Sequence, residues 1–292
     1  MPTRKPILLT KAIDEFIHYL KSKERSKETE RGYNIVLQNF KVYLEKEMNG
    51  QAYVDEITVN HMEDYLSYRK DQGDQPISRN KSLYIFRSFF NYLVRKDHVE
   101  RNISLNLEPI QYQQKERVYL LPEEMVTLIE AVDHIIVKSA VITMANTGLR
   151  VSELCHLTLA DVDLKNKVIK VRQGKGNKDR SIPINDKLHQ ELTTYLKDHR
   201  PLVSSDRFFA TSKTGTLSRQ TINHELEVTT TKLGWSKHVT AHILRHSFAT
   251  SLVRNNAPLP AVQKLMGHSD LRVTSRYIHQ NMDQLQQAVN LI

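Results

Sequence analysis

Arginine 150 lies in a segment whose residue types suit phosphate chemistry. In TGLRVSEL (residues 147–154), Gly148 ends one predicted helix and Arg150 lies at the start of the next. Glu153, three residues further on, can orient the guanidinium group and still leave donors for a phosphate. Considered alone, the segment also fits a surface Arg–Glu pair of little energetic value.

A second candidate segment is TAHILRHSF (residues 240–248), which contains two histidines and an arginine. On a helix, His242, Arg245 and His246 share one face because they are three or four positions apart. The two histidines also have metal-ligand spacing, and His268 could be a third ligand. However, an arginine between the ligands opposes a divalent cation, and no glutamate follows the first histidine as in HExxH. A phosphate suits this set better, so we expect no metal site.

Two further residues extend the list of candidates. Lys175 lies in GKGNKDR (residues 174–180), at the turn of a predicted β-hairpin. Tyr277 lies in SRYIH, shortly after LMGHSD (residues 265–270). Because the chain has 12 tyrosines, the position of this one does not by itself mark it as a nucleophile.

Taken in order, these segments resemble the tyrosine recombinase (phage integrase) family, and in length and layout its Xer-like site-specific recombinases. The resemblance covers nearly the whole chain. It is carried by Arg150 in TGLRVSEL, Lys175 in GKGNKDR, His242 and Arg245 in HILRH, His268 in MGHSD, and Tyr277 in SRYIH. Ala241 stands where the family usually has proline, and Met266 where it usually has leucine. Neither departure removes a reactive group, although Ala241 could alter how the start of the helix is fixed.

The resemblance implies a site-specific recombinase or integrase that cleaves and rejoins DNA strands through a 3′-phosphotyrosyl intermediate. Tyr277 would attack the phosphodiester and release a 5′-hydroxyl. Arg150 and Arg245 would stabilise the charge on the non-bridging oxygens. No ATP is needed, because the tyrosyl ester conserves the energy of the phosphodiester. The lack of a GxxxxGK[ST] loop and of a two-metal cluster of acids agrees with this mechanism, and we expect no cofactor.

The resemblance also assigns the remaining reactive residues. Lys175 would protonate the departing 5′-oxygen, His242 would assist proton transfer at the tyrosine, and His268 would hydrogen-bond the scissile phosphate. Glu153 would support the position of Arg150.

The elements that must position these residues are mainly helical. Apolar residues at helical spacing predict four short helices in the N-terminal third, with Thr10 as a candidate N-cap. They suggest a four-helix bundle, which in the family is a DNA-clamping, SAM-like core-binding domain. The stretch around Pro109 has no apolar period. We therefore predict domains at 1–108 and 119–292, joined by a linker at 109–118.

The second domain is predicted to be a mostly helical catalytic domain with a small antiparallel β-sheet. A helix should begin at Pro122, and a buried helix over 135–147 should end at Gly148. Residues 168–172 and 180–184 predict a hairpin whose second strand, containing Pro183, lies at a sheet edge. Helices follow from about 186. The last predicted helix carries an apolar stripe formed by Met282, Leu285, Val289 and Ile292. In the family such a tail docks on a neighbouring subunit, and packing on its own domain is the alternative.

Charge favours a nucleic-acid partner. Lys and Arg total 42 against 33 Asp and Glu, a net charge of +9, of which +2 lies in residues 1–110 and +7 in 111–292. The densest run, 165–180, has seven basic residues and one acidic residue on and around the hairpin. A solvated lysine-rich face is the alternative. The candidate DNA contacts are Arg79, Lys81, Arg87, Arg172, Lys178 and Arg219.

The resemblance implies double-stranded DNA with paired inverted binding sites as the partner, bound by a homo- or hetero-tetramer. No apolar run is long enough to span a membrane, so we expect no membrane partner. A single cysteine, Cys155, and the lack of a secretory leader predict a cytoplasmic protein. The rival functions are a DNA-binding regulator that has lost the chemistry and a type IB topoisomerase. The full set of reactive residues argues against the first, and the two-domain layout and tail argue against the second. A mobile element, a phage and chromosome-dimer resolution remain open as contexts.

Overall fold

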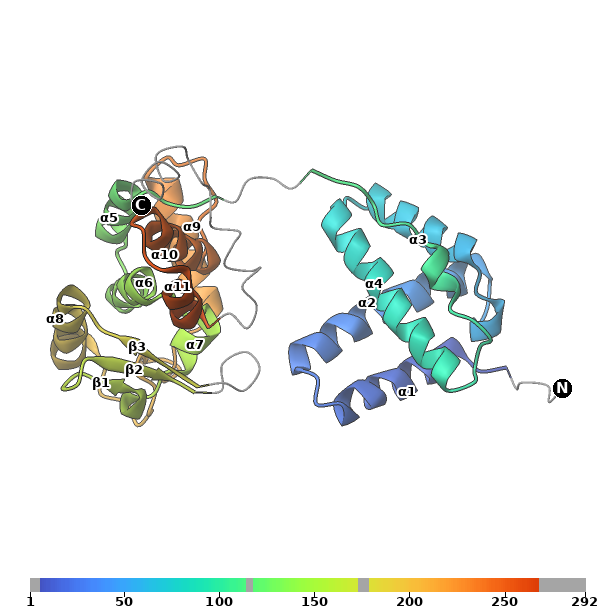
Figure 1. Cartoon of the computed structure of the whole chain (residues 1–292), viewed down its shortest axis with the longest axis horizontal. Coiled ribbons are helices and arrows are strands. Elements are labelled where there is room, and N and C mark those ends of the chain that lie inside the picture. The colour runs from blue at the N-terminus through green and yellow to red at the C-terminus, as the bar shows by residue number, and fades with distance from the viewer. Residues whose placement is uncertain (1–5, 114–117, 173–178, 268–292) are drawn as a thin grey trace, which may run out of the picture. The chain divides into compact units, whose positions relative to one another are not determined.

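The computed structural model describes residues 6–113, 118–172 and 179–267. The chain forms two compact units, Met1–Lys115 and Glu116–Ile292 (Figure 1). The prediction of a mainly α fold with a small antiparallel sheet is confirmed. The domain boundaries at 108 and 119 stay a prediction. Within the described ranges, every helix is too short or too polar to cross a bilayer.

The first unit is a bundle of four helices around an aromatic core. The helices are α1 (Leu9–Ser22), α2 (Lys27–Glu47), α3 (Val59–Asp71) and α4 (Pro76–Arg95), with 3-10 turns η1 (Val54–Glu56) and η2 (Ile103–Asn106). Five phenylalanines are completely buried between them: Phe16, Phe40, Phe86, Phe89 and Phe90. Their ring packing holds the bundle together, because each ring removes a large apolar surface from water.

Hydrogen bonds at the helix starts show what fixes the first residue of two helices in this unit. Thr58 caps α3, accepting a hydrogen bond from His61 N at 3.3 Å. The prediction that Thr10 caps α1 is wrong, because the helix already begins at Leu9. Leu9 N donates to Ala52 O at 2.9 Å, so a contact with a distant segment sets the start of this helix.

The beginning of the predicted linker is fastened to the first unit. Asn80, on α4, is 8% exposed and donates from Nδ2 to the carbonyl of Ile110 at 2.8 Å. Its Oδ1 accepts from Ile110 N at 2.8 Å. A single side chain thus satisfies both backbone groups of Ile110, and we propose that the remainder of 109–118 connects the units.

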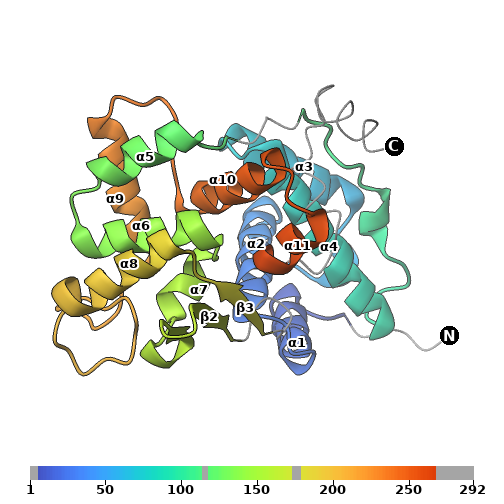
Figure 2. The same ribbon diagram turned by 60° about the vertical axis from the view of Figure 1, so that its left-hand side comes forward.

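Helix α6 is the centre of the second unit. The helices are α5 (Pro122–Ala131), α6 (Ile135–Thr147), α7 (Val151–His156), α8 (Asp186–Thr194), which continues as a π-helical turn η4 (Tyr195–His199), α9 (Arg219–Lys232), α10 (Ala241–Arg254) and α11 (Leu259–Met266). As Figure 2 shows, α6 lies among α5, α8, α9 and α10. The predicted bounds of this helix are confirmed, and most of its apolar side chains are buried, although Ile135 at its start is exposed.

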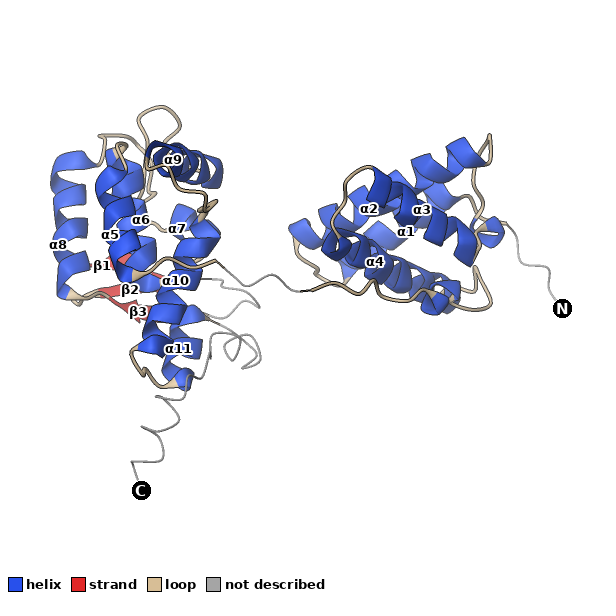
Figure 3. Cartoon of the chain, turned by 90° about the horizontal axis from the view of Figure 1, so that it is seen from above, coloured by secondary structure: helices blue, strands red, loops and turns tan. Residues whose placement is uncertain are grey.

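A small antiparallel sheet completes the second unit (red in Figure 3). Its strands are β1 (Val162–Asp163), β2 (Val168–Val171) and β3 (Arg180–Pro183), in that order. The hairpin is confirmed, with Val168 opposite Pro183 and Val171 opposite Arg180, and Pro183 does lie in an edge strand. The two-residue β1, which follows the turn η3 (Leu159–Asp161), is too short for an alternating pattern to predict.

Candidate active site

Gly148 makes the turn between α6 and α7 possible. Its backbone has φ 62° and ψ 21°, in the left-handed region. A Cβ at this position would lie 2.4 Å from the ring of Phe248 and 2.9 Å from Met266 Sδ. The chain therefore needs glycine here both for its backbone angles and for space. The turn places Arg150 as the N-cap residue of α7.

Glu153 holds Arg150 by both its backbone and its side chain. Arg150 N donates to Glu153 Oε2 at 2.8 Å, and Arg150 Nη1 donates to Oε1 at 2.7 Å. The Glu153 side chain is 8% exposed and that of Arg150 is 25% exposed. This burial distinguishes the pair from the exposed surface pair that the segment alone would also fit.

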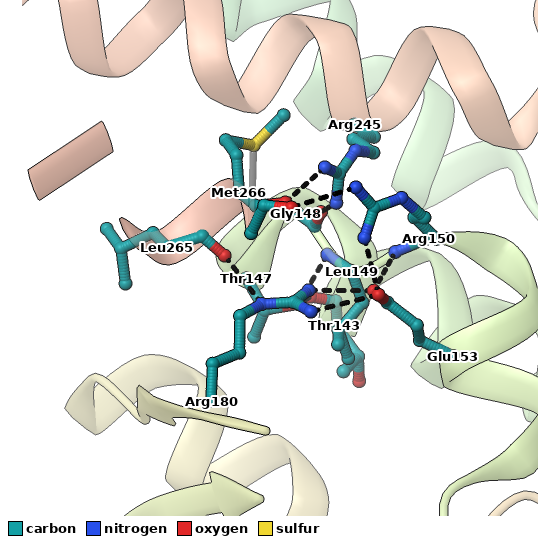
Figure 4. A network of polar contacts seen from close by, with 11 residues as sticks. Thr143, Thr147, Gly148, Leu149, Arg150, Glu153, Arg180, Arg245, Leu265 and Met266 are labelled. Carbon is teal, nitrogen blue, oxygen red and sulfur yellow. Dashed lines mark hydrogen bonds and ion pairs between the residues drawn. The ribbon is translucent and has the colours of Figure 1, made fainter. Parts of the chain in front are cut away.

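A second arginine, Arg180 of β3, binds the same carboxylate (Figure 4). Arg180 Nη1 donates to Glu153 Oε1 at 2.9 Å, and Nη2 donates to Oε2 at 2.7 Å. The Arg180 side chain is 8% exposed. Arg180 was not among the site residues predicted from the sequence, where it is one of seven basic side chains in 165–180. The available signal was strand alternation, since Arg180 has the same parity as the buried Ile182.

Glu153 remains ionised in this environment. Burial raises the pKa of its carboxyl, but the hydrogen bond from Arg180, the backbone N–H of Arg150 and the charges of both arginines lower that pKa to about 2. A charge that is paired and hydrogen-bonded in this way can be retained in the interior.

Arg245 of α10 reaches the same place from another direction. It is 4% exposed, its Nη1 donates to the carbonyl of Gly148, and its Nη2 donates to the carbonyl of Met266. Arg245 therefore joins the end of α6 to the end of α11. The predicted helix around HILRH is confirmed, and its arginine points into the unit.

Three consecutive carbonyls at the C-terminal end of α11 accept hydrogen bonds from three different arginines (Figure 4). Arg180 Nε donates to Leu265 O at 3.0 Å, Arg245 to Met266 O, and Arg150 Nη2 to Gly267 O at 3.1 Å. We call Arg150, Arg180, Arg245 and Glu153 the arginine cluster. Helix C-terminal carbonyls attract cations, but they carry only partial charge. The four side chains together keep a formal charge of 3 − 1 = +2, which suits an anionic ligand.

The start of α10 shows how the chain accommodates alanine in place of the family's proline. Ala241 N donates to Asn223 Oδ1 of α9 at 2.9 Å, so the additional N–H has a partner. His242 follows on the exposed side of the first turn, whereas His246 is buried. Among the described residues there is no group of three potential metal-binding side chains. Met266, which replaces the usual leucine, is fully buried.

Some of the predicted site residues lie outside the described part of the chain. These are Lys175, Lys178, His268 and Tyr277. Their predicted roles stay predictions.

The described candidate DNA contacts differ in their surroundings. On α4, Lys81 is exposed and Arg79 is half-buried, while Arg87 donates to Leu107 O at 2.6 Å. In the second unit, Arg219 is exposed at the start of α9, where Ser218 is the N-cap residue. Arg172 is 63% exposed and its Nε lies 2.7 Å from Asp161 Oδ1. Lys81 and Arg219 therefore have the freest side chains of these five.

Comparisons with known proteins cover the full length of this architecture. Residues 118–284 match the phage integrase family, and residues 13–97 match its N-terminal SAM-like domain. The tyrosine recombinase XerD of Staphylococcus epidermidis is 30% identical over 285 residues, which is 94% of this chain and 95% of that protein. XerD of Staphylococcus aureus is 30% identical over 288 residues, covering 95% and 97% of the two chains.

Solved structures show the same fold. The Tn1549 transposon integrase in complex with a circular intermediate DNA aligns with a TM-score of 0.80 at 18% identity, over 98% of this chain and all of that one. A lambda integrase tetramer bound to a Holliday junction aligns at 0.76 and 19% identity, over 90% and 78% of the chains. The chain therefore belongs to the phage integrase family. Its activity is that of a site-specific tyrosine recombinase.

Proposed function

We propose that the arginine cluster is the phosphate-binding part of a DNA strand-transfer site in which Tyr277 is the nucleophile. The observation that carries this proposal is the excess of two positive charges on four converging side chains, three of them largely buried. When tyrosine attacks a phosphodiester, negative charge develops on the non-bridging oxygens, and fixed guanidinium groups stabilise that charge.

The reaction follows from this arrangement. The Tyr277 oxygen forms a bond to phosphorus while the bond from phosphorus to the 5′-oxygen breaks, leaving a 3′-phosphotyrosyl ester and a 5′-hydroxyl. Rejoining reverses these steps with a second strand, so neither ATP nor a metal ion is consumed. We assign the proton for the leaving 5′-oxygen to Lys175, proton transfer at the phenol to His242, and a hydrogen bond to the phosphate to His268.

The two phosphate-binding arginines differ in accessibility. The Arg150 side chain is a quarter exposed, and Glu153 and Gly267 accept only two of its five side-chain donors. Arg245 is almost fully buried. The proposal therefore requires the site to open around Arg245 when DNA binds, whereas Arg150 can meet the phosphate first.

We propose that the substrate is double-stranded DNA with paired inverted sites, on which this chain, alone or with a related partner, assembles as a tetramer in the cytoplasm. The fold shared with the DNA-bound transposon integrase and the lambda integrase tetramer supports this assignment. The net charge of +9 supports it independently. We assign DNA contacts first to the exposed Lys81 and Arg219, and then to Arg79, Arg87, Arg172 and Lys178.

The nucleophile is tested by covalent capture. Host genomic DNA is sheared and incubated with the protein, adducts are recovered under denaturing conditions, and a nicked suicide duplex is built from the captured sequence. We expect Tyr277→Phe to trap no adduct on this duplex, because the phenolic oxygen that bonds to phosphorus is missing.

Binding of the same duplex provides the control. In a native gel, the Tyr277→Phe variant should retard the duplex at the same protein concentration as the parent chain does. If this variant traps as much covalent adduct as the parent, the nucleophile is a different residue and the assignment is wrong.

A further inference from the structure

Arg180 links three segments of the proposed site by hydrogen bonds. It lies on β3, binds Glu153 near the start of α7 with two hydrogen bonds, and binds Leu265 O at the end of α11 with a third. All three nitrogens of the guanidinium group therefore donate hydrogen bonds, two to Glu153 and one to Leu265 O. No role for this arginine follows from the motifs that identify the family.

Arg180 fixes the orientation of the Glu153 carboxylate. Each carboxylate oxygen accepts one hydrogen bond from Arg180 and one from Arg150: Oε1 at 2.9 and 2.7 Å, and Oε2 at 2.7 and 2.8 Å, respectively. A two-pronged Arg–carboxylate contact sets the plane of the carboxylate as well as its distance. Arg150 donates hydrogen bonds to the same two oxygens, from its backbone N–H and from Nη1. Its position therefore depends on how Arg180 orients the carboxylate.

Arg180 also fixes the other support of Arg150, the end of α11. A Cβ on Gly267 would lie 2.9 Å from Arg180 Nη1, so the backbone of Gly267 packs directly against the guanidinium group. The carbonyl of this same glycine accepts the hydrogen bond from Arg150 Nη2. Arg150 is thus held on one side by Glu153 and on the other by Gly267, and both are in contact with Arg180.

We propose that Arg180 is a positioning residue for strand cleavage, which sets the guanidinium group of Arg150 through Glu153 and through the end of α11. The role rests on the proposed function, since the position of Arg150 affects the rate only if Arg150 acts on the phosphate. Arg180 itself is not assigned a contact with DNA.

The experiment compares Arg180→Met and Arg180→Lys on the suicide duplex obtained by covalent capture. Single-turnover adduct formation is measured at saturating protein, and affinity is measured separately. Because misplacing a group by about 1 Å costs on the order of 100-fold in rate, we expect about that loss for R180M. Lysine keeps the charge but cannot span both carboxylate oxygens, so R180K should cleave about tenfold faster than R180M and about tenfold more slowly than the parent. The dissociation constant should stay within about threefold of the parent for both variants.

Arg200→Met is the matched control. Arg200 is half-buried and, like Arg180, donates to backbone carbonyls, which here belong to Ser205, Arg207 and Phe208 and not to the arginine cluster. Folding of each variant is followed by the fluorescence of Trp235, the single tryptophan. R200M should cleave within about twofold of the parent rate per folded molecule, since it disturbs only local structure.

A double mutant separates positioning from an independent effect. If Arg180 acts through Glu153, the variant E153Q/R180M should cleave no more slowly than the slower single variant. Multiplying losses would overturn the proposal, as would folded R180M that cleaves at the parent rate or R200M that is as slow as R180M. If R180M does not fold, R180K decides: a tenfold loss supports the role and the parent rate overturns it.

Arg150→Lys distinguishes this inference from the proposed function. R150K that cleaves at the parent rate would overturn the assignment of Arg150 to the phosphate, and the proposal for Arg180 with it. R150K without activity, together with R180M at the parent rate, would overturn only the positioning role.

Discussion

A single buried carboxylate organises the candidate site at the scale of residues. Glu153 faces Arg150 and Arg180, and its ionised state depends on both of them. Removing either partner would leave a buried charge with incomplete compensation, which is costly. The carboxylate therefore contributes to the stability of the second unit as well as to the geometry of the site.

The stability contributed by Glu153 should depend on pH. Its pKa is about 2 in the folded chain against a reference of 4.5, so the contribution is fully present above pH 4.5 and is lost as the pH falls towards 2. The full difference corresponds to about 3 kcal/mol. Urea unfolding followed by Trp235 fluorescence should show the parent more stable than Glu153→Gln at pH 6. This gap should shrink by more than about 1 kcal/mol at pH 3. A gap that is constant with pH would contradict the lowered pKa.

Local spacing predicted part of this site and missed the rest for a physical reason. Gly148, Arg150 and Glu153 lie within six positions, so their relation was visible in the sequence. Arg180 is 27 positions from Glu153, and only the register of the hairpin reveals that it points inward. In a run of basic residues, composition does not distinguish Arg180 from exposed described residues such as Lys170 and Arg172.

At the scale of elements, apolar spacing located the main helices, while their ends depend on contacts from elsewhere. Gly148 ends α6 where predicted, because a left-handed residue stops a helix locally. Leu9 begins α1 because a distant segment accepts its N–H. Similarly, the first N–H of α10 is satisfied by Asn223 of α9, which no local pattern could have predicted.

The contact at the start of α10 gives a test of this kind of cap. Asn223→Ala should destabilise the second unit by about 1 kcal/mol, because it leaves the N–H of Ala241 without its acceptor. In an Ala241→Pro background that N–H does not exist, so the same substitution should cost nearly nothing. The measurement is a double-mutant cycle of urea unfolding followed by Trp235 fluorescence. An equal cost in both backgrounds would show that Asn223 stabilises the chain by another contact.

At the scale of the whole molecule, the excess of positive charge includes side chains in very different surroundings. On α4, Lys81 is exposed, whereas Arg87 donates to Leu107 O and lies 5.7 Å from the ring of Tyr84. Net charge predicted a polyanionic partner, but it could not distinguish exposed basic side chains from those that are bound within the unit. Burial and hydrogen bonding make that distinction between Lys81 and Arg87.

Lys81 and Arg87 should therefore respond differently to truncation. Lys81→Ala should weaken DNA binding and reduce the magnitude of the slope of log affinity against log salt by about 1, since one phosphate contact is lost. Its thermal unfolding should match that of the parent. Arg87→Ala should lower the stability of the first unit, measured by circular dichroism, because its hydrogen bond to η2 is lost. An unchanged salt slope in Lys81→Ala would place that lysine away from the DNA.

The hydrogen bonds at the end of α11 have a consequence for synthesis of the chain. The three guanidinium groups come from positions 150, 180 and 245, but their carbonyl acceptors come from 265, 266 and 267. A nascent polypeptide thus makes all three arginines before it makes the backbone carbonyls that accept their hydrogen bonds. Products of interrupted translation that stop before Leu265 lack these acceptors, so the arginine cluster reaches its folded arrangement only after α11 has been synthesised.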